Sequence, residues 1–276
     1  MTELIRADFR RLSKNRVFWL GTGLMLLLGI ALPVGAYLAY GDYPNAVFFD
    51  SYFTTYSIVA IVLLGAFVPL FLGTDYSDGT MRNKLIAGHR RSAVYLSGLV
   101  VSSVAGLSLC AAYLIPYLMI APKLLGEFTL GRALLIQLIL ASLAMCVSFG
   151  AIFTLISMLS SSKARSAVLC LVCAMLLMYA GIFVSGRLAE PKSYPNYDLG
   201  ENGELVEFDT PNPSYVSGNA RKVLSVINDL NPGGQAVGIF TKDTSVRASK
   251  LAAYDLIMFV AASGVGMAVF KRKDLK

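Results

Sequence analysis

The sequence lacks most of the side chains with which enzymes and metal proteins do their chemistry. His89 is the only histidine among 276 residues, and it lies beside Arg90 and Arg91. A zinc site or a histidine-based catalytic triad therefore has too few parts. No phosphate-binding loop of the form GxxxxGK[ST] occurs in the sequence, which excludes ATP binding by that route. We expect this chain to be no enzyme and to hold no cofactor of its own.

Cysteine is also scarce, and its placement excludes a disulfide scaffold. The four cysteines, at positions 110, 146, 170 and 173, all lie inside apolar stretches. Cys170 and Cys173 form a CxxC, but no second pair accompanies it. Small packing residues explain this pair better than a metal site does.

Charged residues are too few for a soluble domain. Only 15% of the residues are charged and 56% are hydrophobic, whereas a soluble domain carries about 25% charged residues. The composition predicts an integral membrane protein. The basic pI of about 9.2 is then explained by membrane topology and anionic lipid head groups, not by nucleic acid.

Six apolar stretches are long enough to cross a bilayer as helices, since about 20 residues suffice. We predict an all-α integral membrane fold in which residues 1–276 form a single transmembrane domain. The first span is too long and too far from the N-terminus to be a signal peptide, so we expect it to be retained. The predicted spans are about 17–40, 51–73, 94–121, 133–160, 166–186 and 251–270.

The distribution of lysine and arginine predicts the topology. Residues 1–16, 74–93 and 271–276 are basic, whereas residues 41–50 contain neither lysine nor arginine. By the positive-inside rule, both termini are cytoplasmic and the segment 187–250 is extracellular. We therefore expect a multi-pass protein of the cell membrane.

Residues 1–16 fit an amphipathic helix in the cytoplasmic interface. Leu4, Phe9 and Leu12 share one face, and Asp8 falls inside this apolar stripe, where it either pairs with Arg11 or stays in water. Such a helix is either a topology anchor or an elbow that a partner moves.

The cytoplasmic loop 74–91 has room for a helix of two turns. Asp78 and Thr80 suit the N-cap position and Gly88 suits the C-cap, with Met81 and Leu85 on one face. The helix is either a docking surface or a loop whose charges only obey the positive-inside rule.

The outer segment 187–250 divides into two halves. Residues 187–220 read as an irregular acidic loop with room for short strands. Residues 219–240 predict an apolar-faced helix that Asn231-Pro232-Gly233-Gly234 stops, and that rests against the bundle or dips into the interface. Asp255 follows early in the last span, where we expect water, Arg247 or Lys250 to reach it.

Aromatic residues crowd the first outer loop. They are either a membrane-interface belt or a ligand vestibule and outer gate. The cluster consists of Tyr37, Tyr40, Tyr43, Phe48, Phe49, Tyr52, Phe53 and Tyr56.

The order of these segments resembles a known family. Asp75-Tyr-Ser-Asp-Gly-Thr-Met-Arg-Asn-Lys-Leu-Ile-Ala-Gly-His-Arg-Arg91, after the second span, is similar to the corresponding loop of bacterial permease subunits of ATP-binding-cassette (ABC) transporters, type 2 exporter class. The outer Asn231-Pro232 and the basic tail Phe270–Lys276 are also typical. Asp75 departs from the pattern, because many relatives have glutamate there.

The resemblance implies a function and partners. The loop after the second span would be a coupling helix seated in a separate cytoplasmic ABC ATPase subunit, which holds ATP and Mg²⁺. A second permease copy, identical or a sister chain, would complete the exporter in the lipid bilayer. The implied coupling residues are Asp75, Gly79, Thr80, Arg82, Leu85, Arg6 and Arg10.

The substrate of such an exporter would pass between the two permease copies. An acidic, aromatic outer side suits an amphipathic cargo such as a peptide antibiotic. The alternative is a membrane scaffold or sensor subunit that transports nothing. The residues assigned to the substrate path or outer gate are Tyr52, Phe53, Thr54, Thr55, Tyr56 and Ser57.

Overall fold

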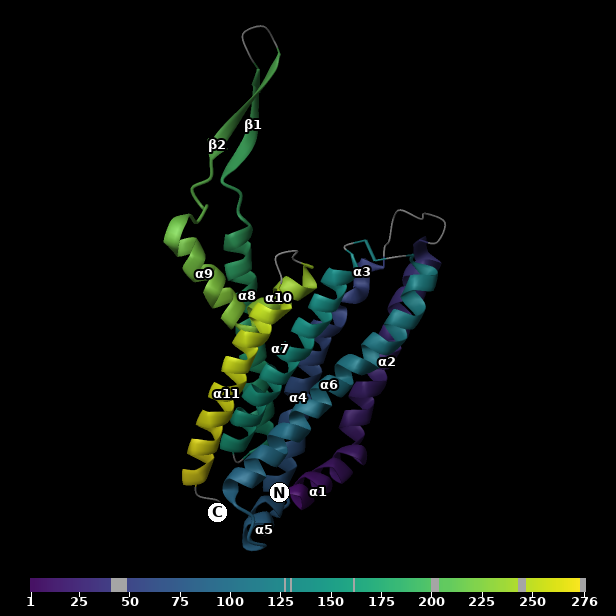
Figure 1. The fold of residues 1–276 in the computed structure, drawn as a ribbon, viewed down its shortest axis with the longest axis vertical. Coiled ribbons are helices and arrows are strands. Elements are labelled where there is room, and N and C mark those ends of the chain that lie inside the picture. Colours follow the sequence, from purple (N-terminus) through teal and green to yellow (C-terminus); the bar gives the residue numbers. More distant parts are fainter. Residues whose placement is uncertain are drawn as a thin grey trace.

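The computed structural model describes residues 1–40, 49–126, 128–129, 131–160, 162–199, 204–242 and 247–273. Tyr43 and Phe48 of the aromatic cluster, and residues 274–276 of the basic tail, lie outside these ranges. The elements, in chain order, are α1 (Thr2–Ser13), α2 (Arg16–Tyr40), α3 (Asp50–Phe53), α4 (Thr55–Ser77), α5 (Thr80–Ile86), α6 (Arg91–Leu124), α7 (Arg132–Leu159), α8 (Lys163–Ala189), β1 (Ser193–Leu199), β2 (Leu205–Pro211), α9 (Gly218–Leu230), α10 (Pro232–Phe240) and α11 (Ala248–Arg272) (Figure 1).

Six helices are long and apolar enough to span a membrane, as the sequence predicts. They are α2, the α3–α4 pair, α6, α7, α8 and α11. The α3–α4 pair, α6, α8 and α11 extend beyond their predicted bounds, because polar residues at the ends continue the helix past the apolar run, whereas α2 and α7 match their predicted bounds to within one residue. The structure is that of a multi-pass helical membrane protein.

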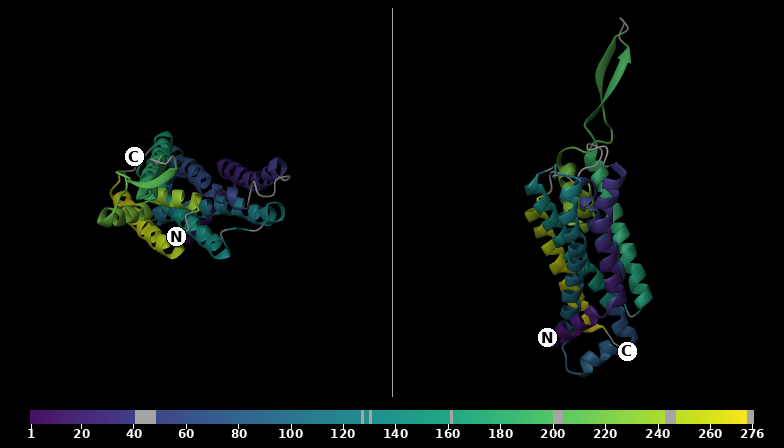
Figure 2. Two further views of the ribbon diagram at one scale, coloured as in Figure 1. Left: turned by 90° about the horizontal axis from the view of Figure 1, so that it is seen from above. Right: turned by 90° about the vertical axis from the view of Figure 1, so that its right-hand side faces the viewer.

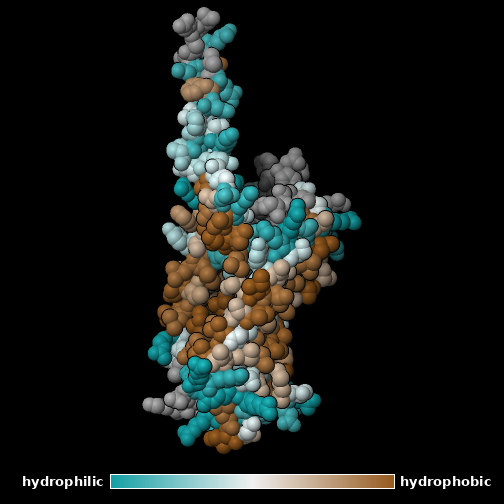
Figure 3. Space-filling view, turned by 60° about the vertical axis from the view of Figure 1, so that its left-hand side comes forward, coloured by the Kyte–Doolittle hydropathy of each residue, from teal (hydrophilic) through white to brown (hydrophobic). Residues whose placement is uncertain are grey.

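The long helices form one bundle with two distinct ends. α1, α5 and the last turn of α11 lie together at one end, which we call the terminal end, while β1 and β2 project from the other, the hairpin end (Figures 1 and 2). α4 lies in the middle and packs against α6, α7 and α8, whereas α2 packs mainly on α6 and α11 mainly on α7. Apolar surface covers the middle of the bundle between polar ends (Figure 3).

The outer segment contains the only sheet among the described residues. β1 and β2 pair antiparallel, from Ser193 opposite Pro211 to Leu199 opposite Leu205. At the base of this hairpin, Tyr194 and the Asn212 amide both donate hydrogen bonds to the carboxylate of Glu190, over 2.6 and 2.9 Å. These two bonds, from Tyr194 first, lower the pKa of Glu190. The fold is thus helical apart from this hairpin.

α9 and α10 form a re-entrant turn that the sequence analysis described only in part. α9 ends at Leu230, as predicted from Asn231-Pro232, but Pro232 then begins α10 instead of a loop. Proline is favoured at the first position of a helix, and the Asn231 side chain caps it by accepting a hydrogen bond from the Gly233 N–H, over 3.0 Å.

Contacts with α8 show how deep this turn lies. Arg221, early in α9, donates to the Leu188 carbonyl, and Asn231 donates to the Leu177 carbonyl, halfway along α8. α10 then leads back to α4, where Thr54 donates to the Phe240 carbonyl over 3.1 Å. The turn therefore descends to the middle of the bundle and returns.

The apolar face of α9 points away from the bundle. Val223, Val226 and Ile227 are exposed, and no residue of α9 is buried. The prediction that this face rests against the bundle is wrong. The polar side of α9 faces α8 instead, since Arg221 and Asn228 bond to it.

Candidate functional site

A buried network of polar and charged side chains joins four helices at the terminal end. The ammonium group of Lys84 (α5) lies 2.9 Å from Asp8 Oδ1 (α1) and 3.0 Å from Asp75 Oδ2 (α4). Arg11 (α1) forms an ion pair with Asp75, and Ser97 (α6) donates a hydrogen bond to Asp8 Oδ2 over 2.6 Å. We call these five residues the charge network. Its two acids and two bases balance each other.

Burial governs the electrostatics of the charge network. Asp8, Asp75 and Ser97 are buried, and the side chains of Lys84 and Arg11 are largely covered. Burial lowers the pKa of Lys84, and the charge of Asp8 opposes this shift. Burial likewise lowers the pKa of Arg11, with Asp8 again opposing. Each base therefore depends on the acids for its charge, because an unpaired buried cation is costly.

The structure gives Asp8 different partners from those expected. Asp8 is neither paired with Arg11 nor left in water, but bound by Lys84 and Ser97. Arg11 turns to Asp75 and lies over the Phe71 ring, with its guanidinium carbon 4.0 Å from the ring centroid. Asp8 can occupy the apolar stripe of α1 because its partners come from α5 and α6, which a helical projection of α1 alone does not contain.

α5 is a compact helix with well-defined ends. It begins after Gly79, whose φ of +70° favours glycine, so neither Asp78 nor Thr80 is the N-cap that we predicted. At the other end, the Gly88 N–H bonds to the Leu85 carbonyl and the His89 N–H to the Lys84 carbonyl, over 3.0 and 3.3 Å. This Schellman arrangement, with Gly88 at a φ of +86°, confirms the predicted C-terminal glycine.

Two residues that the resemblance assigns to a partner are covered by the chain itself: Asp75, near the end of α4, and Leu85, on α5. Asp75 is 2% exposed and fully engaged by Arg11 and Lys84, so it cannot reach a partner in this conformation. Leu85 is half-buried and packs on the core, as does the buried Met81. Assigning partner contacts to Asp75 therefore needs correction: its role lies inside the chain.

The outer face of α5 presents a different set of side chains. Arg82, Asn83 and Ile86 are exposed, and Ile86 is 73% exposed. Sequence reasoning missed Ile86 and Lys84. Ile86 lies four residues after Arg82, about one helical turn, and this spacing would have placed Ile86 on the same face as Arg82. Gly79 is exposed beside this face, and Thr80 is half-buried.

α1 brings further basic residues to the same end of the bundle. Arg6 and Arg10 are exposed on α1, which the charge network holds beside α5. The exposed surface formed by Arg6, Arg10, Arg82, Asn83 and Ile86 is called the outer basic face below. This face has one prominent apolar side chain, that of Ile86, among basic ones. Ile86 belongs to α5, which buried ion pairs attach to the membrane-spanning helices.

The end of α11 is tied to the same region. Arg91 (α6) donates to the carbonyls of Phe270, Lys271 and Lys273 and so caps α11. The Lys273 ammonium donates to the Met158 carbonyl over 2.9 Å and lies 4.3 Å from the Tyr76 ring centroid. Burial, with a smaller contribution from Arg165, lowers the pKa of Lys273 to about 8.

The residues assigned to a substrate path mostly pack inside the chain. Phe53, Thr54, Tyr56 and Ser57 are all buried. The Tyr56 hydroxyl shares a 2.5 Å hydrogen bond with Ser142, and Ser57 donates to the Thr54 carbonyl over 2.8 Å. These four residues hold helices together in this conformation and do not line an open path, which corrects the assignment.

The remaining two path residues are half-buried. They are Tyr52, whose carbonyl accepts a hydrogen bond from Tyr113 over 2.7 Å, and Thr55.

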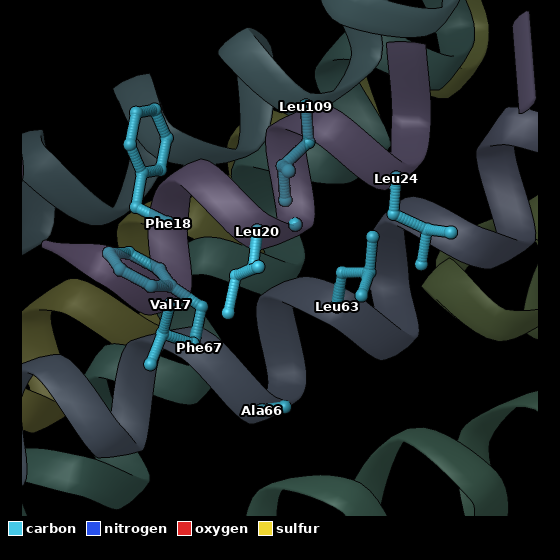
Figure 4. Close-up of a pocket in the computed structure, with 9 residues that line it drawn as sticks. Val17, Phe18, Leu20, Leu24, Leu63, Ala66, Phe67 and Leu109 are labelled. Carbon is cyan, nitrogen blue, oxygen red and sulfur yellow. The ribbon is translucent and has the colours of Figure 1, made fainter. Parts of the chain in front are cut away.

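Two hollows lie elsewhere on the surface. An apolar groove of about 200 Å³ lies between α2, α4 and α6, where Phe18, Leu20, Leu63 and Phe67 line it (Figure 4). A larger and more polar cleft of about 660 Å³ lies between α8, α9 and α10, beside Arg221. Neither contains a residue of the assigned path.

Among the described residues, no group of three or more histidine, cysteine, aspartate or glutamate side chains could hold a metal ion. No protein-family model matches the chain, and no curated protein matches its sequence.

Proposed function

We propose that the chain is the transmembrane subunit of an ATP-driven exporter of the ABC type, in the cell membrane of a bacterium. A separate ATPase subunit would hold ATP and Mg²⁺ and supply the energy. The terminal end would face the cytoplasm and the hairpin end the outside. The cargo would be an amphipathic compound such as a peptide antibiotic.

The observation that supports this proposal is the attachment of α5. Lys84 and Asp75 join it to α1 and α4 through buried ion pairs, while Ile86 and Arg82 stay exposed. A partner that holds the outer basic face would move α1, α4 and α5 as one body, because packed elements shift as units and deform little. Arg6, Arg10, Arg82 and Ile86 would contact the ATPase, with Gly79 and Thr80 at the start of the contact.

A second copy of the chain, or a sister chain, would complete the exporter. Several helices have apolar faces that the chain itself does not cover, including Leu176 and Phe183 on α8 and Leu256 and Val260 on α11. Lipid and the second copy would share these faces. The substrate path would then run between the two copies.

The polar cleft between α8, α9 and α10 favours a second candidate function. A subunit that binds a ligand at this cleft, beneath a projecting hairpin, would serve as a sensor or scaffold without transporting anything. This alternative predicts no movement of cargo into vesicles.

The decisive experiment compares two exposed apolar residues at opposite ends. Ile86 and Leu205 are both 73% exposed. The tagged full-length chain is purified from its native membrane as wild type, Ile86→Asp and Leu205→Asp. We expect an ATPase subunit with a phosphate-binding loop to co-purify with the wild type and Leu205→Asp, and to be lost with Ile86→Asp. Vanadate-sensitive ATP hydrolysis should follow the same pattern. Equal recovery of the ATPase with both variants, or with none of the three, contradicts the proposal.

A further inference from the structure

Asp255 of α11 lies deep in the bundle, not near its outer end. Ser148, in the middle of α7, donates a 3.0 Å hydrogen bond to the Asp255 carbonyl, which places Asp255 at that level. The re-entrant turn explains the depth, because it carries the chain down before α11 begins. Lys250, which we expected to reach Asp255, instead pairs with Asp229 of α9, and Arg247 is exposed. The expectation of a wet or ion-paired Asp255 is wrong.

The carboxyl group of Asp255 lacks a hydrogen-bond donor. Asp255 is 3% exposed, and neither Oδ1 nor Oδ2 has a hydrogen-bond partner. Its polar neighbours are Ser148 and Gln235, the latter in the first turn of α10. Gln235 is 2% exposed, and its Oε1 also lacks a donor. Both carboxyl oxygens of Asp255 and Oε1 of Gln235 are therefore buried acceptors without a bonded hydrogen, although the side chains of Ser148 and Gln235 lie within reach of the carboxyl group.

The nearby donors are already used. The Gln235 amide nitrogen donates to the Asp229 carbonyl over 2.8 Å, and the Ser148 hydroxyl donates to the Asp255 carbonyl. The charged groups on the elements that pack around α11 are Asp229, Arg221 and Lys222 of α9, Arg132 of α7, and Arg91 and Lys123 of α6, while α10 contains none. α11 itself carries Lys250 near its start and Lys271 and Arg272 at its end, and Arg247 precedes it. Arg221 is bonded to α8 and Lys250 to Asp229. No described cation is thus directed at the carboxyl group.

We propose that Asp255 and Gln235 form an intramembrane proton-binding site. A proton on Asp255 converts one carboxylate oxygen from an acceptor into a donor, which can then bond to Gln235 Oε1. Protonation also removes the negative charge of Asp255 from an apolar environment. The proton comes from water and returns to water, and no covalent bond other than O–H changes. The site holds the first turn of α10 against α11 while it is protonated. Ionisation requires water to enter, and therefore requires α10 to separate from α11.

Close backbone packing fixes Gln235 in this position. A Cβ atom at Gly233 would collide with the Leu177 carbonyl, and one at Gly181 would come within 2.5 Å of the Gly234 nitrogen. The two glycine contacts press α10 onto α8, so Gln235 cannot move to another partner without the turn moving. The position of the re-entrant turn and the protonation of Asp255 are consequently linked. This link does not depend on the exporter proposal.

Infrared difference spectroscopy tests the site on the full-length protein in lipid nanodiscs. At neutral pH, we expect a carbonyl band of a protonated carboxyl group that shifts in D₂O and is lost in Asp255→Asn. This variant keeps the shape, and its amide can donate to Gln235 in place of the proton, so it should fold. Asp229→Asn, which removes the half-buried acid that pairs with Lys250, should leave the band in place. Gln235→Leu should keep the band and shift it to higher frequency, because the carboxyl group loses its acceptor.

Several outcomes overturn the proposal. One is the absence of an Asp255-dependent band of a protonated acid at neutral pH. Another is an ionised Asp255 carboxylate band that changes when sodium is replaced by choline, which would assign the site to a metal cation. A band that Gln235→Leu leaves unshifted would remove Gln235 from the site.

Discussion

Asp8 and Asp75, from two helices far apart in the sequence, bind the same ammonium group, that of Lys84. Two carboxylates side by side would repel each other, and Lys84 and Arg11 together neutralise them. α1 is therefore attached to the spans through the side chain of Lys84, which belongs to a third helix, α5. Four predictions follow from this arrangement and from the packing around it.

Removing Lys84 should destabilise the protein strongly. Lys84→Met leaves a buried acid uncompensated, and breaking a buried ion pair in this way costs about 3–5 kcal/mol. Thermal unfolding in detergent measures the loss. Arg82→Met, on the exposed face of the same helix, is the control and should change stability by no more than about 0.5 kcal/mol. Equal effects of the two variants would contradict the charge network.

Ser97 should matter more than an ordinary serine of its helix. Ser97→Ala leaves Asp8 Oδ2 without a donor, which costs about 1–3 kcal/mol for a buried polar group. Ser108→Ala is the matched control, because the Ser108 hydroxyl bonds only to the Val104 carbonyl of its own helix. We expect a clear drop in melting temperature for Ser97→Ala and almost none for Ser108→Ala.

A single methyl group at Gly233 should displace the re-entrant turn. Gly233→Ala places a Cβ against the Leu177 carbonyl, and overpacking of this kind costs about 1–3 kcal/mol. Gly264 of α11 has no atom within 4 Å of its would-be Cβ, so Gly264→Ala should be neutral or slightly stabilising. Melting temperatures of the two variants in nanodiscs make the comparison, and a stable Gly233→Ala would mean that α10 does not pack so closely on α8.

Lys273 should react as a free amine at a lower pH than the exposed Lys271 beside it. Its pKa, lowered from 10.5 to about 8 by burial, means that the folded protein releases this proton before the unfolded chain does. Between pH 8 and 10.5 the unfolded state binds more protons, so docking of the tail is favoured as the pH rises. Quantitative mass spectrometry of amine labelling from pH 7 to 10 should show Lys273 modified ahead of the exposed Lys271. Unfolding the protein before labelling should abolish the difference.

The sequence predicts the spans but not the connections between them. Apolar length alone locates all six long helices, because it reflects the thickness of the bilayer. The start of α10 at Pro232 could not be foreseen, because the sequence Asn-Pro-Gly-Gly is compatible both with the end of one helix and with the beginning of another. The depth of Asp255 follows from that return, and so was misjudged.

The candidate site was foreseen in outline only. Local pattern identifies a short helix between Gly79 and Gly88, since backbone requirements at the ends are local. Which of its faces is exposed depends on residues from distant elements: Asp8 pairs with Lys84, and Ser97 donates a hydrogen bond to Asp8. The result is an error of one residue: the contact was assigned to Leu85, whereas the exposed apolar side chain is that of Ile86.

α6 has 34 residues and is therefore about 51 Å long, against a hydrocarbon core of about 30 Å. Such a helix must tilt or project beyond the bilayer. Ser97 near one end binds Asp8, while Tyr117 near the other donates to the Phe49 carbonyl over 2.6 Å. Lipid chain length therefore acts on both contacts: a thinner membrane that increases the tilt of α6 pulls on the charge network and on the aromatic cluster together.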